Sequence, residues 1–94
     1  MKQIYTNTLY ERFRKCISDI KDKFGISYKE MSIITGISQS RLHGILNKGY
    51  QPTYEEIESI TEAFNLDEDD CSELLAAAGR NTKYAPIMCK NKKR

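Results

Sequence analysis

The chain of 94 residues is long enough for one domain only, because two separate cores would each bury too little apolar surface. No apolar run approaches the length of a membrane span, the mean hydropathy is −0.62, and the first residues do not form an apolar leader. Three cysteines without Cys-x-x-Cys spacing and a single histidine argue against a disulfide framework, a metal site and catalysis, and suit a reducing cytoplasm. We therefore expect a small binding module that is not an enzyme and needs no cofactor.

The net charge of +2 conceals three blocks of alternating sign. Residues 1–51 carry +5, residues 52–79 carry −9 without any Lys or Arg, and residues 80–94 carry +6. The first and last blocks suit a polyanionic partner, whereas the acidic middle does not. Each block taken alone can equally be a solvated face.

Apolar residues recur at helical spacing along most of the chain, and no stretch alternates as a strand would. The first helix is expected to start at a capping box, Thr8-x-x-Glu11, and to end at a left-handed cap on Gly25. Its expected inner face consists of Leu9, Phe13, Cys16, Ile17, Ile20 and Phe24.

The second and third helices are expected to be short. Ser27-x-x-Glu30 repeats the capping-box spacing, and Gly36 closes that helix. Ser38 is a natural N-cap for the third helix, which Gly49 ends. The residues expected to face inward from these two helices are Met31, Ile34, Leu42, Ile45 and Leu46.

A fourth helix is expected after the capping box Thr53-x-x-Glu56, and a fifth from an N-cap at Asp67 to Gly79. Their expected inner residues are Ile57, Ile60, Phe64, Cys71, Leu74, Leu75 and Ala78. Five short helices with short loops predict a compact all-α domain over residues 8–79. An arm of residues 1–7 precedes it. A basic tail of residues 80–94 without periodicity follows, from which Ile87 and Met88 can dock.

Residues 28–47 are organised as a helix-turn-helix, because two short helices flank a glycine-containing turn and the second helix is polar on its outer face. Ser32 supplies the small residue where the helices cross, and Gly36 supplies the turn residue. The apolar positions that lock the two helices are Met31, Ile37, Leu42 and Ile45.

This unit and the five-helix layout around it resemble the Cro/phage-repressor-type, or lambda-repressor-like, DNA-binding domain. The resemblance runs from about Leu9 to Gly79 and includes Pro52 and Thr53 after the unit. It also includes the end of the fifth helix, Leu74-Leu75-Ala76-Ala77-Ala78-Gly79. The chain departs from the family pattern at Tyr28, where Gln is frequent, and at Ser32, where Ala is usual. The resemblance implies sequence-specific binding of double-stranded DNA.

In such domains the second helix of the unit lies in the major groove and reads base edges. By position, the resemblance implies base readout by Gln39, Ser40, Arg41 and His43. It implies phosphate contacts from Tyr28, Lys29, Asn47, Lys48, Tyr50 and Gln51. Gly44 is expected to let the backbone approach the bases. The alternative is an ordinary solvated role for each side chain or, for Tyr50, a ring packed on the loop.

The fifth helix is the usual pairing surface of this family, so the resemblance also implies a homodimer on a two-fold operator. The expected pairing residues are Glu73, Leu74, Ala76, Ala77 and Ala78, although the alanines can simply reflect helix propensity. The acidic middle of the chain opposes pairing unless it is neutralised. The tail cations Lys90, Lys92, Lys93 and Arg94 can neutralise it, contact DNA, or form a solvated end.

Three functions follow as hypotheses. The first is a transcription regulator in the cytoplasm, at the nucleoid of a bacterial or phage-infected cell, with a phage or prophage repressor or Cro-like regulator as its leading form. The second is an autorepressing antitoxin, which predicts that residues after Gly79 fold onto a toxin. The third is a protein-interaction module whose acidic residues 54–78, or whose tail, bind a protein partner.

Overall fold

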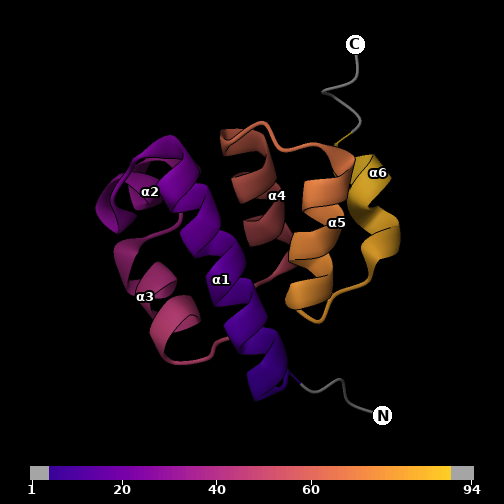
Figure 1. Cartoon of the computed structure of the whole chain (residues 1–94), viewed down its shortest axis with the longest axis horizontal. Coiled ribbons are helices and arrows are strands. Elements are labelled where there is room, and N and C mark those ends of the chain that lie inside the picture. The colour runs from indigo at the N-terminus through magenta and orange to yellow at the C-terminus, as the bar shows by residue number, and fades with distance from the viewer. Residues whose placement is uncertain (1–4, 90–94) are drawn as a thin grey trace.

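The structure is a computed structural model that describes residues 5–89. Its helices are α1 (Asn7–Phe24), α2 (Tyr28–Thr35), α3 (Gln39–Asn47), α4 (Tyr54–Ala63), α5 (Glu68–Ala77), the 3₁₀ helix η1 (Thr82–Tyr84) and α6 (Ala85–Met88) (Figure 1). The all-α prediction is confirmed, since residues 5–89 contain helices and no strand. None of these helices is both long and apolar enough to span a membrane.

Local capping signals fix most helix ends at the predicted positions. Ser27 and Thr53 both form complete capping boxes, and Ser38 and Asp67 also cap helices with their side chains. The start of α1 was predicted wrongly. Thr6, not Thr8, is its N-cap, because the Thr6 hydroxyl accepts the N–H of Leu9 at 3.2 Å and leaves Thr8 inside the first turn.

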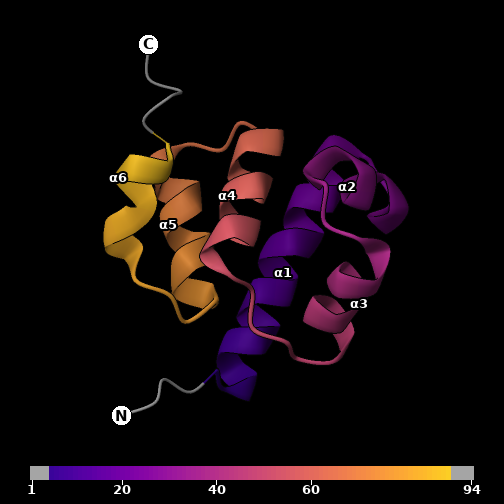
Figure 2. The ribbon, with the colours of Figure 1, turned by 180° about the vertical axis from the view of Figure 1, so that it is seen from behind.

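The core is one cluster to which all five helices from α1 to α5 contribute, with α2 and α3 at one end of the molecule and α5 and α6 at the other (Figures 1 and 2). Phe13 and Ile17 of α1 are buried against residues of the other helices, as predicted. Ile34 was expected inside but is 47% exposed. Thr35 takes the inner position on α2, where its hydroxyl donates to the Met31 carbonyl at 2.8 Å.

Phe24, in the last turn of α1, is also more exposed than expected, at 44%. Its ring centroid lies 5.0 Å from that of Phe64. Cys71 is fully buried and Cys16 is half-buried against the core.

The chain beyond Gly79 continues the fold, which corrects the five-helix layout and the expected start of the tail. Both η1 and α6 pack on α5, and they bury Ala85 and Cys89 (Figure 1). The Cys71 and Met88 sulfur atoms are 3.7 Å apart. A helix of only four residues is too short to show a periodic pattern, so the sequence did not reveal it. The cations expected to act in the tail, Lys90, Lys92, Lys93 and Arg94, lie outside the described residues.

Candidate nucleic-acid interface

The turn before α3 is fixed by buried hydrogen bonds. The Ser32 hydroxyl donates to the Ile37 carbonyl at 2.6 Å, and the Ile37 N–H donates to the Thr35 hydroxyl at 3.2 Å. Ser38 then caps α3 by accepting the N–H of Arg41 at 3.1 Å. The helix therefore leaves the turn in one defined direction.

One face of α3 is buried and the other is open. Leu42, Ile45 and Leu46 are at most 6% exposed and lock the helix against the domain. This burial leaves a polar outer face of Gln39, Ser40, His43 and Asn47, all of them exposed. Asn47 Nδ2 and His43 Nδ1 are joined by a hydrogen bond of 3.0 Å, so these two side chains are oriented together.

A shallow cleft between α1, α2 and α3 brings several predicted site residues together. Its lining includes Tyr28 and Lys29 from α2 and Gln39, His43 and Asn47 from α3, over a floor that contains Leu42 and Leu46. Ser40 and Lys48 are exposed but do not line this cleft.

Arg14 of α1 also lines the cleft, and sequence reasoning missed it. The neighbouring Tyr10 hydroxyl donates to the Leu46 carbonyl at 2.7 Å and so ties α1 to the end of α3. The Arg14 guanidinium carbon lies 5.8 Å from the centroid of the Tyr10 ring. The local sequence does not distinguish Arg14 from Arg12. Arg14 reaches the cleft because of the way α1 lies beside α3, which only the structure shows.

Tyr50 and Gly44 form a packing contact, which corrects the expectation for Gly44. Gly44 is buried, and a Cβ added there would meet the ring of Tyr50. The glycine therefore makes room for the tyrosine ring. The Tyr50 ring packs on α3 at Gly44, while Tyr50 stays 47% exposed, and its expected phosphate contact stays a prediction.

Gln51 has internal partners on both its side chain and its backbone. Its amide nitrogen donates to the Ala78 carbonyl at 2.8 Å, and its own carbonyl accepts from Arg41 Nη2 at 3.1 Å. One of its two amide donors thus fastens the α3–α4 loop to the end of α5, and the phosphate contact expected from the sequence stays a prediction.

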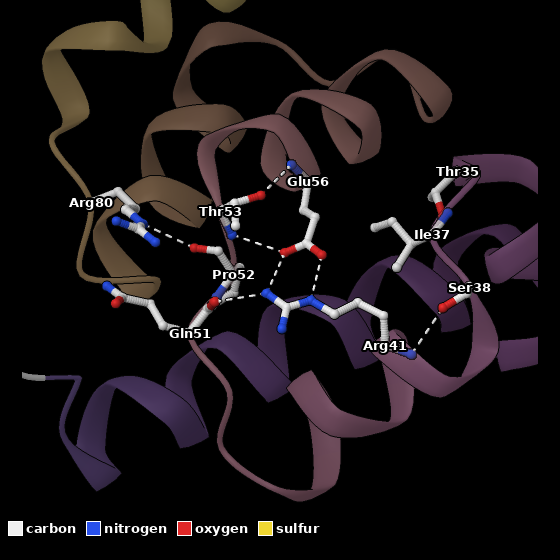
Figure 3. A network of polar contacts seen from close by, with 9 residues as sticks. All are labelled: Thr35, Ile37, Ser38, Arg41, Gln51, Pro52, Thr53, Glu56 and Arg80. Carbon is white, nitrogen blue, oxygen red and sulfur yellow. Dashed lines mark hydrogen bonds and ion pairs between the residues drawn. The ribbon is translucent and has the colours of Figure 1, made fainter.

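Arg41 turns toward α4 (Figure 3). Its Nη2 donates to Glu56 Oε1 at 2.9 Å and its Nε to Glu56 Oε2 at 2.5 Å, which is a two-pronged ion pair. The hydrogen bond to Glu56 raises the pKa of Arg41. Burial raises the pKa of Glu56, but its hydrogen bonds with Arg41 and Thr53 outweigh burial, and the net pKa is lowered. Both groups are therefore charged at neutral pH.

The expected pairing residues on α5 lie mostly inside the chain's own fold, so that expectation needs correction. Leu74, Ala77 and Ala78 are at most 2% exposed, because α5 is surrounded by α1, α4, η1 and α6. Ala76 is half-buried, and Glu73 is exposed. The small side chains serve helix packing within one chain.

The described part of the chain has no group of three His, Cys, Asp or Glu side chains placed to hold a metal ion. A short helix, a glycine-capped turn and a second helix with an open polar face together define a helix-turn-helix, the class of DNA-binding domain to which this fold corresponds.

Comparison with known families agrees with this class. A helix-turn-helix family model matches residues 17–71, which is more than half of the chain. The chain belongs to this family, the Cro/C1-type helix-turn-helix family of DNA-binding regulatory domains, as its resemblance predicted. No curated protein and no solved structure matches the chain.

Proposed function

We propose that the chain is a sequence-specific transcriptional regulator that binds operator DNA by placing α3 in the major groove. The observation that carries the proposal is the exposed polar face of α3, with Lys29 and Arg14 on the cleft beside it. Polar side chains at the start of such a helix reach base edges, and flanking cations meet phosphates.

The proposed base contacts and the proposed phosphate contacts come from different side chains. Gln39, in the first turn, is proposed to pair with an adenine through its amide, and Ser40 to contact a neighbouring base edge. His43 and Asn47 act as one hydrogen-bonded unit facing the groove. The proposed phosphate contacts come from exposed side chains around α3 and the cleft, namely Arg14, Tyr28, Lys29 and Lys48.

The leading form of this regulator is a phage or prophage repressor or a Cro-like regulator, and the family match is its support. The antitoxin hypothesis expected residues after Gly79 to fold onto a toxin, but residues 82–89 pack on α5 of the same chain. The protein-interaction hypothesis expected a loss of polar residues from the outer face of α3, and four polar residues are exposed there. Both observations favour the regulator.

Two copies on a two-fold operator remain part of the proposal, because a domain of this size has only a modest DNA footprint. The pairing surface must lie elsewhere than on Leu74, Ala77 and Ala78, which the protomer itself buries.

The full chain is expected to select specific duplexes from a random DNA pool. The logarithm of the binding constant should fall with the logarithm of the salt concentration, with a slope of about −0.9 for each phosphate neutralised. Fluorescence anisotropy on a selected duplex at several salt concentrations measures this slope. Failure to enrich any sequence, or binding that does not respond to salt, would contradict the proposed function.

Gln39→Ala is expected to cost about 1–3 kcal/mol on the selected duplex and to relax the preference at one base pair. Lys48→Ala should weaken binding to all duplexes alike and reduce the steepness of the salt dependence by about one unit. Anisotropy titrations of both variants on cognate and scrambled duplexes make the comparison. An equal loss on both duplexes for Gln39→Ala would assign Gln39 to a phosphate.

A further inference from the structure

The side chain of Arg41 leaves the outer face of α3 and crosses to the first turn of α4. It forms a two-pronged contact with Glu56 and a third hydrogen bond with the Gln51 carbonyl (Figure 3). The Arg41 and Glu56 side chains are 34% and 16% exposed, so the pair is partly shielded from solvent. Two-pronged contacts of this kind fix relative orientation as well as adding energy.

Glu56 is held independently of Arg41 by the start of its own helix. Its Oε1 accepts the N–H of Thr53 at 2.9 Å, and its own N–H donates to the Thr53 hydroxyl at 3.1 Å. The carboxylate also lies in the first turn of α4, where the helix dipole favours negative charge. Glu56 is thus a fixed anchor to which Arg41 of α3 is attached.

The loop that joins α3 to α4 is fastened on its other side by residues near the end of α5. Arg80 Nε donates to the Pro52 carbonyl at 2.9 Å (Figure 3). At the preceding residue, the Gln51 amide donates to the Ala78 carbonyl at 2.8 Å. The exit of α3 is therefore tied both to α4 and to the C-terminal part of the domain.

We propose that Arg41 is a positioning residue, which contacts neither a base nor a phosphate. It sets the orientation of α3 on DNA through its two-pronged ion pair with Glu56, which is called the clasp from here on. This inference rests on the proposed function. The Nε and Nη2 edge of the guanidinium, which offers two parallel donors, already faces the carboxylate. A DNA contact through that edge would require breaking a charged pair and leaving Glu56 facing a polyanion.

Glu56→Gln separates this role from a direct DNA contact. Removing a negative charge near the interface should tighten binding if Arg41 is thereby released to DNA. If Arg41 positions α3, the affinity for the cognate duplex should instead fall by about tenfold, with little change on scrambled DNA. Gln can keep the capping box with Thr53, so the start of α4 is preserved.

Glu55→Gln is the matched control, because Glu55 is the adjacent acid in the same helical turn and is exposed. It removes the same charge without touching the clasp, and it should leave the ratio of cognate to scrambled affinity unchanged. Arg41→Gln should reduce that ratio as Glu56→Gln does, while retaining the parental salt slope. The double variant, Arg41→Gln with Glu56→Gln, should have a ratio of cognate to scrambled affinity no lower than that of either single variant. Tighter cognate binding by Glu56→Gln, or a salt slope reduced in Arg41→Gln, would overturn the inference.

A second measurement, made without DNA, separates failure of the clasp from failure of the proposed function. Amide hydrogen exchange in α3 should be faster in Arg41→Gln and Glu56→Gln than in Glu55→Gln and the parent. If the parent binds no duplex but this pattern appears, the proposed function fails and the clasp stands. Equal exchange in all four proteins would show that the clasp does not hold α3.

Discussion

A chain cut after Gly79 is expected to lose about 2–4 kcal/mol of unfolding free energy, because it loses apolar burial and several internal hydrogen bonds. The cut removes the buried Ala85 and Cys89 and exposes the part of α5 that η1 and α6 cover. It also removes the bond from Arg80 to the Pro52 carbonyl and the bond from the Asn81 N–H to the Tyr54 hydroxyl, at 2.9 and 3.0 Å. Urea unfolding followed by circular dichroism measures the loss.

A cut after Cys89 is the control for this truncation. It removes four of the six cations that follow Gly79 and keeps the contacts of η1 and α6 with α5. Its unfolding free energy should stay within about 0.5 kcal/mol of that of the full chain. If the shorter chain were as stable as this control, the packing of α6 on α5 would contribute nothing, and residues 80–89 would be a tail after all.

The parts of the fold that the sequence predicted depend on short-range chemistry. A capping box such as Ser27-x-x-Glu30 satisfies the first N–H groups of a helix with residues three positions apart, so its signal is complete within a few residues. Glycine ends α1 at Gly25 and α2 at Gly36 for an equally local reason, because both adopt positive φ. The helix-turn-helix was predictable because it consists of these signals in series.

The parts that the sequence did not predict depend on contacts between distant residues. Helical periodicity correctly placed Arg41 outside the buried face of α3. It did not show that the side chain bends toward Glu56, which lies 15 positions away. The contact between Gly44 and Tyr50 was also missed, although it is local: the Tyr50 N–H donates to the Gly44 carbonyl at 3.2 Å and the ring lies over the glycine.

The α5 residues show a different difficulty. Leu74, Ala77 and Ala78 have the composition of a close-packed helix contact, and they do form one. Small side chains allow close approach of any second helix, so the sequence did not distinguish a partner within the chain from a second copy. Here η1 and α6 belong to the same chain as the helix that they cover.

The turn between α2 and α3 gives a second large expected effect, on both stability and DNA binding. Gly36 has φ of 81°, a conformation that a β-branched residue adopts only under strain. A Cβ at this position would meet no atom within 4 Å, so the cost of a substitution there comes from the backbone alone. Gly36→Val should therefore lower the unfolding free energy by about 1–3 kcal/mol.

DNA binding should suffer as well, because relief of the strain at Gly36 moves the adjacent Ile37, whose carbonyl accepts the Ser32 hydroxyl. That bond fixes the turn from which α3 leaves, so Gly36→Val should lower the affinity for the selected duplex even at temperatures where the variant remains folded. Gly36→Asn is the matched control, since asparagine tolerates positive φ and adds a side chain into the same open space. The unfolding free energy of Gly36→Asn, from the same urea titration, should lie between that of Gly36→Val and that of the parent. A valine variant as stable as the asparagine variant would mean that the turn tolerates a different backbone conformation, and that the direction of α3 does not depend on the positive φ of Gly36.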